Sequence, residues 1–385
     1  MPPTTTKPLT AEEARVCATG WDFNRPDPFP GLGDFIGWAG GLERMPNGNL
    51  LLAHSAGYWH ASFASPRLFE KETRERYAAE GWPVDFVAPT GGRSMAVHST
   101  DDGRTWSKPV ELTNIPLDDG PVTLFVCQDN TVLCFINVQA SWYGFTEAPP
   151  AFRKDLNGLN TQQCVIRSTD SGATWSEPIW LDSPGSFYER SHGQAFQLPD
   201  GGILWPTYCS SQDENHLFGA IRCSDDVGRT WRTVSTIRRE DKDVDEPAIA
   251  RFDDGRLVMV SRPDGGIFFS DDEGVSWRES GQMVESGTVK APRLFVLKDG
   301  TLVCVTTYQG GLYVFLSRDG GLNWTPELPL DVSCYGYPGG LQMEDGSLLI
   351  SYCESGKAPN RVYVIRFQVN STRDGIELLG IGNSS

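Results

Sequence analysis

Residues 243–277 read DVDEPAIARFDDGRLVMVSRPDGGIFFSDDEGVSW, and this stretch decides the fold. It holds three short runs rich in β-branched and other apolar residues, at 248–250, 257–260 and 266–269. An Asp-Gly pair separates the first two runs, and Pro-Asp-Gly-Gly separates the last two. Short runs joined by such turn residues are typical of antiparallel strands in hairpins. The stretch therefore predicts three consecutive antiparallel strands.

Two charged residues mark one edge of this predicted sheet. The first strand runs toward the turn at Asp254 and Gly255 and the second runs back, so Glu246 and Arg262 are expected at the same edge. A carboxylate and a guanidinium at one rim indicate a site that does chemistry. A structural ion pair would use the same two residues.

The end of the stretch belongs to a pattern that recurs along the chain. Ser-x-Asp-x-Gly-x-Thr-Trp occurs five times, with Ser276 and Asn323 in the Thr place of two copies. Asp, Ser and Thr side chains bond the amides of a tight turn, Gly supplies a positive φ, and the Trp folds back over its hairpin. Five copies predict a repeat architecture. They are Ser99–Trp106, Ser168–Trp175, Ser224–Trp231, Ser270–Trp277 and Ser317–Trp324.

Six hairpin turns, each followed by an apolar strand, form a second repeat. Together the repeats predict six four-stranded sheets arranged radially, which is an all-β six-bladed propeller in a single domain over 1–385. The run Ala14–Ala18 is expected to supply a strand to the last blade. The turns lie at Asn47-Gly48, Asp129-Asn130, Asp200-Gly201, Asp254-Gly255, Asp299-Gly300 and Asp345-Gly346. The predicted blades are 30–112, 113–181, 182–236, 237–284, 285–328 and 329–385.

An insertion at about 57–92 interrupts the first predicted blade. Residues 66–80 are compatible with a short amphipathic helix, which would begin after Ser65 and end at Gly81. The alternation of strand direction places this insertion on the rim that carries Glu246. It is either a wall or lid of a pocket, or a surface insertion.

Composition excludes several classes of partner. The net charge of −17 argues against nucleic acid and anionic membrane surfaces. No apolar stretch approaches the roughly 20 residues of a membrane span, and no signal peptide is visible. The nine cysteines show no metal-ligand spacing, so we expect buried free thiols in a cytoplasmic protein without metal or cofactor. A secreted protein whose leader had been removed would look the same.

Position within the repeat predicts which residues meet at one end of the central channel. Nine residues before the second turn residue of each blade stand Ala39, Pro121, His192, Glu246, Ala291 and Tyr337. Polar and aromatic residues flank these positions: Trp38, Asp118, Asp119, Glu189, Arg190, Gln194, Lys290, Arg293 and Tyr335. Each has a structural interpretation, as a channel residue or an ion-pair partner. Acidic, phenolic and guanidinium groups are costly to bury together, so their convergence predicts a site.

The repeated turn motif is the Asp-box, and the chain resembles the sialidase superfamily of six-bladed propellers over roughly 30–370. In that family a Tyr nucleophile is activated by a Glu, an Asp is the acid and base, and three Arg bind the sugar carboxylate. The resemblance assigns the nucleophile to Tyr337, its base to Glu246 and one Arg of the clamp to Arg262. Asp85, in the loop before the first motif, takes the place of the acid.

Two positions depart from the family. Its first Arg stands where this chain has Trp38-Ala39-Gly40, and its third stands where this chain has Gln309-Gly310-Gly311. Arg190, Lys290 and Arg293 are candidates to replace the missing charges. Further substrate-binding candidates are His192, Trp38, Glu189, Asp119 and Tyr335.

The resemblance implies a retaining exo-glycoside hydrolase that removes a terminal sugar from a glycan. A phenol nucleophile avoids repulsion with a substrate carboxylate, and at its pKa of roughly 10 it needs a base. One alternative is an arabinanase- or rhamnosidase-like hydrolase of a neutral sugar, with Glu246 as nucleophile or base and Glu189 as acid. Trp38 and Tyr335 would then be stacking platforms. Another alternative is a propeller that binds glycans without catalysis.

Overall fold

A computed structural model gives the fold of this chain. It describes residues 7–20, 35–57, 75, 79, 93–113, 118–139, 161–185, 188–211, 214–355 and 361–381. The predicted insertion at 57–92 lies almost entirely outside the described residues, and Asp85 lies outside them too.

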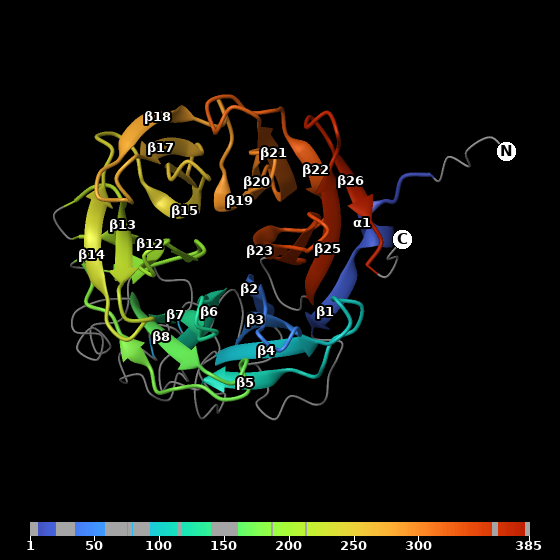
Figure 1. The fold of residues 1–385 in the computed structure, drawn as a ribbon, viewed down its shortest axis with the longest axis horizontal. Helices are drawn as coiled ribbons and strands as arrows, with labels where there is room; N and C mark the ends of the chain where they lie inside the picture. The colour runs from blue at the N-terminus through green and yellow to red at the C-terminus, as the bar shows by residue number, and fades with distance from the viewer. Residues whose placement is uncertain are drawn as a thin grey trace.

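The described strands form six sheets around a central axis, so the predicted six-bladed propeller is confirmed (Figure 1). Blade one comprises β2 (Phe35–Arg44), β3 (Leu50–Gly57), β4 (Arg93–Ser99) and β5 (Val110–Thr113). Blade two comprises β6 (Asp118–Val126), β7 (Val132–Gln139), β8 (Thr161–Ser168) and β9 (Ile179–Trp180). Blade three comprises β10 (Tyr188–Arg190), β11 (Phe196–Gln197), β12 (Ile203–Ser210), β13 (Phe218–Ser224) and β14 (Arg232–Ile237). Blade four comprises β15 (Asp245–Arg251), β16 (Leu257–Arg262), β17 (Gly266–Ser270) and β18 (Arg278–Gln282). Blade five comprises β19 (Lys290–Val296), β20 (Leu302–Tyr308), β21 (Gly311–Ser317) and β22 (Leu328–Asp331). Blade six comprises β23 (Gly336–Gln342), β24 (Leu348–Cys353), β25 (Arg361–Val369) and β26 (Ile376–Leu379).

Two blades depart from four simple strands. In blade three the innermost strand is split, and both β10 and β11 pair with β12. In blade six, β25 pairs with β26 and also with the N-terminal strand β1 (Val16–Gly20). An N-terminal strand therefore closes the ring as predicted, but it lies two residues later in the sequence than the predicted run Ala14–Ala18. A single turn of helix, α1 (Ala11–Ala14), precedes β1 and begins with a capping box between Thr10 and Glu13.

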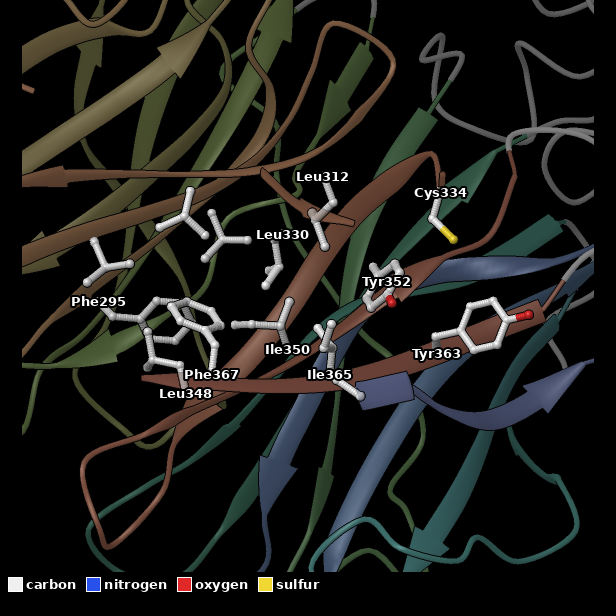
Figure 2. Packing of buried hydrophobic residues seen from close by; sticks show 14 of the residues in the cluster. Phe295, Leu312, Leu330, Cys334, Leu348, Ile350, Tyr352, Tyr363, Ile365 and Phe367 are labelled. Carbon is white, nitrogen blue, oxygen red and sulfur yellow. The ribbon is translucent and has the colours of Figure 1, made fainter. Parts of the chain in front are cut away.

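The hydrophobic core lies between neighbouring blades. Buried side chains form clusters whose members come from two adjacent sheets, and together these clusters cover every blade-to-blade interface. Between blades five and six, Leu312 and Leu330 pack against Ile350, Ile365 and Phe367 (Figure 2). Because each blade covers one face of the next, the sheets that the structure describes leave no large face exposed. All nine cysteines are free thiols, and all but Cys17 are buried.

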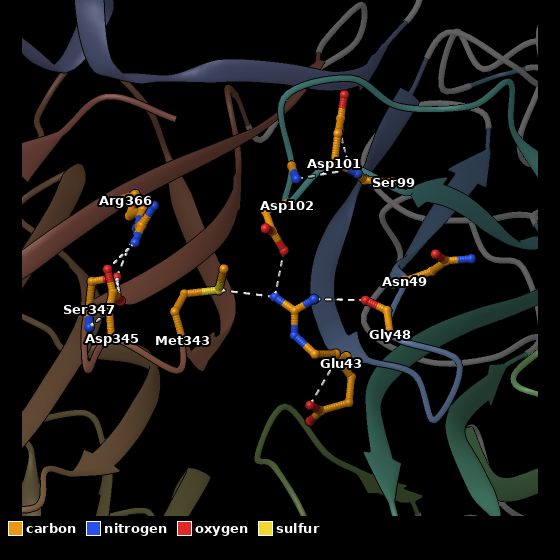
Figure 3. Close-up of polar contacts among 12 residues, drawn as sticks. Glu43, Gly48, Asn49, Ser99, Asp101, Asp102, Met343, Asp345, Ser347 and Arg366 are labelled. Carbon is orange, nitrogen blue, oxygen red and sulfur yellow. Dashed lines mark hydrogen bonds and ion pairs between the residues drawn. The ribbon is translucent and has the colours of Figure 1, made fainter. Parts of the chain in front are cut away.

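The repeated turns hold their hydrogen bonds within themselves. In the third copy the Gly228 amide donates to Ser224 Oγ at 2.8 Å, and the amide and hydroxyl of Thr230 donate to the Asp226 carboxylate at 2.8 and 2.7 Å. Trp231 folds back and donates its indole N–H to the Gly228 carbonyl at 3.2 Å. In blade one, Arg44 at the end of β2 donates to Asp102 of the first turn at 2.8 Å, and the same guanidinium lies 3.7 Å from Met343 Sδ of blade six (Figure 3).

The strand directions separate these turns from the predicted site. In blade four, β15 begins next to Glu246 and ends before the hairpin turn at Asp254 and Gly255. The hairpins and Asp-box turns therefore lie at one end of the blades and Glu246 at the other. Within the described residues, no helix is long and apolar enough to cross a membrane.

Candidate active site

Tyr337 and Glu246 form the centre of the candidate site. Tyr337 lies in β23 of blade six and Glu246 in β15 of blade four. The Tyr337 hydroxyl donates to Glu246 Oε1 at 2.7 Å, although the residues are 91 positions apart in the sequence. Both side chains are almost fully buried, at 8% and 2% exposure. The contact predicted from repeat register is therefore present.

Three other groups bond or approach the Glu246 carboxylate. The Ala291 amide, in β19 of blade five, donates to Oε2 at 2.7 Å. Arg262 Nη1 donates to Oε1 at 3.3 Å, as expected for two residues at one edge of a sheet. Arg262 Nε also lies 3.5 Å from Asp245 Oδ2, so the guanidinium stands between two carboxylates. His192 Nε2 lies 3.8 Å from Glu246 Oε1.

A β-bulge in each of these inner strands directs the site residues. Glu246, Ala291, Tyr337 and Trp38 have φ angles of 47°, 45°, 55° and 50°, and each lies where the strand register shifts. Bulges next to active sites re-aim side chains, and a positive φ outside glycine carries strain. In blades four, five and six the bulged residue is followed by proline, whose missing N–H is not needed in a bulge.

In blade one, the left-handed residue differs from the one that the repeat register predicted. Counting back from the turn identified Ala39, but the left-handed residue in that blade is Trp38. The reason is a wider bulge, because three residues between Gly37 and Gly41 lie opposite the single residue His54. The aromatic ring of Trp38 therefore faces the site.

Aromatic rings surround the Tyr337 phenol. The ring centroid of Trp38 lies 4.4 Å from that of Tyr337 in an edge-on arrangement, and that of Tyr335 lies 5.5 Å away in a stacked one. The His192 ring is 5.1 Å from Tyr337, and Tyr208 stacks on His192 at 6.2 Å. Lys290 Nζ lies 5.8 Å from the Tyr335 ring. Such a wall suits the apolar face of a sugar.

Burial changes the protonation of the site. Burial, followed by the nearby Glu246 charge, raises the pKa of Tyr337 well above its ordinary value. Burial lowers the pKa of His192 to about 4, only partly opposed by Glu246, and Arg190 and Arg262 lower it further. At neutral pH the phenol is therefore protonated and the imidazole is uncharged. His192 contributes a hydrogen-bonding ring and no positive charge.

Glu189 is not available to a sugar. Its side chain is fully buried, and Oε1 accepts from the Thr207 hydroxyl at 2.6 Å and lies 3.7 Å from Arg222 Nε. Burial raises the pKa of this carboxyl group. The structure therefore corrects the interpretation of Glu189 as an acid facing Glu246, because blade three encloses it.

Arg293 is also enclosed. Its guanidinium bonds the Gly40 carbonyl and lies 3.4 Å from both Thr123 Oγ1 and Gln194 Oε1, so it joins blade five to blades one, two and three. With 1% exposure it holds inner strands together and leaves no surface for a substrate carboxylate. Asp119 pairs with Val138 through its backbone in β6, and its side chain lies outside the described part of the structure.

Three groups at the site were not singled out from the sequence: the Ala291 amide, Asp245 and Tyr208. Asp245 is 8% exposed, and burial together with Glu246 raises its pKa. The repeated X-Pro step at Glu246, Ala291 and Tyr337 is a sequence signal for the bulges. No local pattern distinguishes Tyr208. Among the described residues, no cluster of three or more His, Cys, Asp or Glu side chains is placed to hold a metal ion.

Comparison with known proteins agrees with this architecture. The sequence profile of the BNR repeat-like domain matches residues 121–350, which is more than half of the chain. The chain belongs to the BNR repeat-like domain family. The resemblance to the sialidase superfamily is thereby confirmed at the level of the family.

Two sialidases and one arabinanase illustrate how this family member compares with proteins of known activity. The chain is 27% identical over 265 residues to a sialidase of Bacteroides fragilis, covering 60% of this chain and 47% of that protein. It is 26% identical over 203 residues to a sialidase of Clostridium perfringens, covering 47% and 51%. The chain thus spans about half the length of the curated relatives it matches. An α-L-arabinanase of Penicillium chrysogenum, solved with arabinobiose, has the same fold at a TM-score of 0.56 and 15% identity, covering 93% and 98%.

Proposed function

We propose that this chain is an exo-acting, retaining glycoside hydrolase of the sialidase type, with Tyr337 as nucleophile and Glu246 as its base. The observation that carries the proposal is the 2.7 Å hydrogen bond between the Tyr337 hydroxyl and Glu246 Oε1 at the channel rim. A nucleophile and a base within hydrogen-bond reach, with the base oriented by further groups, is the arrangement of covalent catalysis. The similarity to sialidases of Bacteroides fragilis and Clostridium perfringens supports it.

The reaction proceeds in two steps. Tyr337 Oη attacks the anomeric carbon while Glu246 accepts the phenol proton, and the bond to the departing oxygen breaks. Asp85 is the proposed acid that protonates this oxygen, and its carboxylate then removes a proton from water. The water attacks the anomeric carbon, and Tyr337 leaves and recovers its proton from Glu246. Two displacements at one carbon retain its configuration.

The surrounding groups support these roles for Glu246. The Ala291 amide and Arg262 stabilise the carboxylate before it accepts a proton. The Ala291 bond occupies Oε2, which leaves Oε1 directed at the phenol. Because the Tyr337 pKa is raised, the phenol reacts only when its proton is removed during the attack.

The proposal is tested by two conservative substitutions. We expect Glu246→Gln to lower kcat about 10²–10⁴-fold on the best of a panel of aryl glycosides, and Tyr337→Phe to lower it at least as much. Tyr313→Phe, in β21 of blade five, is the matched control and should keep wild-type rates. The stereochemistry of the product is followed by NMR.

Wild-type rates in both variants would remove Tyr337 and Glu246 from the mechanism. Sugar binding that survives Glu246→Gln, without turnover of any glycoside by the wild type, would favour a propeller that binds glycans without catalysis.

A hydrolase of a neutral sugar is the second candidate, and the ion pairs of Arg262 with two carboxylates of the protein favour it. The guanidinium already lies between Asp245 and Glu246, and Trp38 stands where the resemblance places another Arg. The site then presents aromatic rings more than positive charge. The same fold serves an arabinanase solved with arabinobiose. Because Glu189 is enclosed, this candidate also relies on Tyr337 and Glu246.

Arg262→Ala separates the two candidates. If the natural sugar bears a carboxylate, we expect KM to rise about 10-fold or more for acidic glycosides and to change little for neutral ones, because a charge-assisted bond is lost. If the sugar is neutral, we expect kcat to fall on all substrates through the loss of support for Glu246, with no selective effect on KM. Kinetics on paired acidic and neutral aryl glycosides measure the difference.

A further inference from the structure

Four consecutive blades, from blade four round to blade one, are connected at the rim by three bonds of the same kind. The left-handed residue of one inner strand donates its backbone N–H to a side chain of the preceding blade. Ala291 donates to Glu246 Oε2 at 2.7 Å, Tyr337 donates to Thr307 Oγ1 at 2.8 Å, and Trp38 donates to Cys353 Sγ at 3.0 Å. The first of these bonds orients the candidate base. The second acts on the backbone of the candidate nucleophile.

Thr307 is built into the sheet of blade five. It lies in β20, pairs with Lys290 of β19 and Leu312 of β21, and is 1% exposed. Its hydroxyl therefore has a fixed position, and water does not compete for it. A buried amide without an acceptor costs about 1–3 kcal/mol, so the Tyr337 N–H depends on this one oxygen.

Gly336 makes this contact possible. The φ of Gly336 is 108°, and a Cβ on this residue would lie 2.2 Å from Thr307 Oγ1. A side chain at this position would displace the hydroxyl. The absence of a side chain at Gly336, the hydroxyl of Thr307 and the positive φ of Tyr337 are three features of one arrangement.

We propose that Thr307 is a positioning residue for the nucleophile. By accepting the Tyr337 amide it holds the backbone in the left-handed conformation, and this conformation directs the phenol across blade five to Glu246. The inference rests on the proposed role of Tyr337 as the nucleophile. Thr307 itself touches neither the phenol nor the carboxylate in any described hydrogen bond.

Three substitutions test the kinetic consequence. Thr307→Val keeps the shape and removes the acceptor, and we expect kcat to fall about 10²-fold with KM changed less than about threefold, since a displaced reacting group loses alignment and not sugar contacts. Thr307→Ser keeps the hydroxyl and should restore most of the rate. Thr306→Val is the matched control, because this neighbour is equally buried and its hydroxyl donates to the Lys290 carbonyl at 2.8 Å on the other side of the strand. If Thr307→Val does not fold, Thr307→Ala replaces it.

A spectroscopic measurement makes the test independent of turnover. 3-Fluorotyrosine placed at position 337 gives one ¹⁹F resonance that reports the surroundings of this phenol. We expect the resonance to be displaced in Thr307→Val and to superimpose on the wild type in Thr307→Ser and Thr306→Val. If the wild type hydrolyses no glycoside but the resonance moves, the proposed reaction fails and the positioning contact stands. An unmoved resonance, or an unchanged kcat in an active enzyme, would overturn the role of Thr307.

Discussion

The left-handed backbone of Glu246 and Tyr337 and the burial of the Glu246 carboxylate are both energetically unfavourable. A left-handed backbone outside glycine costs about 1–3 kcal/mol, and burial of a carboxylate costs more unless the group is bonded. Here Arg262, the Ala291 amide and the Thr307 hydroxyl supply the bonds. They come from blades four and five, so the site is stable only when neighbouring blades are in place.

A pH effect on stability is expected from a different residue, His54. Its side chain is fully buried, Nδ1 lies 3.1 Å from the Ser55 carbonyl, and burial lowers its pKa from 6.5 to about 4. Between these pH values the unfolded chain binds a proton that the folded protein excludes. The stability due to neutral His54 is therefore complete above pH 6.5 and is lost as the pH falls to about 4.

Each pKa unit is worth about 1.4 kcal/mol, so the loss is on the order of 3 kcal/mol. We expect the unfolding free energy of His54→Gln, measured by urea titration at several pH values, to decline less steeply than that of the wild type in this window. Two parallel curves would show that His54 does not contribute.

At the scale of the element, the Asp-box turn is a self-contained unit. Asp226 accepts from the Ser224 hydroxyl at 2.9 Å and the Arg229 amide at 3.0 Å, as well as from Thr230. All these bonds lie within one turn, so its sequence alone specifies it. The turns are at the opposite end of the blades from Glu246, and we infer that they serve the fold.

Substitution of one such aspartate should lower stability and spare activity. We expect Asp226→Ala to reduce the unfolding free energy by about 1–2 kcal/mol, the usual effect of removing a side chain that caps backbone amides. Asp225→Ala is the matched control, since this carboxylate pairs with Arg232 on the surface, where the side chains are 64% and 58% exposed. Urea denaturation and kcat on the same samples measure both effects. A loss of activity without a loss of stability would contradict the structural role.

At the scale of the whole molecule, one cation fastens the strand that closes the ring. Arg15 precedes β1 and donates through Nη1 to Asp331 Oδ2 at 2.9 Å and Ser333 Oγ at 3.1 Å, while its guanidinium lies 4.4 Å from the Tyr363 ring. The Asp331 side chain is 1% exposed and also accepts from Tyr352. The first and last parts of the chain thus meet in one buried network.

Removal of this cation should destabilise the entire ring. We expect Arg15→Ala to lower the unfolding free energy by about 2–4 kcal/mol, because Asp331 is left buried without its partner. Arg232→Ala, which breaks the exposed pair with Asp225, should cost less than about 1 kcal/mol. Both values come from urea unfolding of the full chain. Equal losses in the two variants would show that closure does not depend on Arg15.

Much of the fold could be predicted because turn chemistry is local. The five Ser-x-Asp-x-Gly repeats and six hairpins identified the blades, and their register brought Tyr337 and Glu246 to one rim. The sequence did not predict that Glu189 is enclosed by Arg222, or that Trp38 replaces Ala39 as the left-handed residue. Both depend on how many residues a bulge contains and on which face of the blade is covered.

The amino-acid sequence by itself therefore determined the number of blades, their order and the end of the channel at which the polar residues gather. Only the tertiary structure decided which groups bond one another there. The Ala291 amide meets Glu246, and Thr307 meets Tyr337, across interfaces between blades. Such contacts require the ring to close and the backbone to adopt a positive φ, and neither condition is specified by the residues on one strand alone.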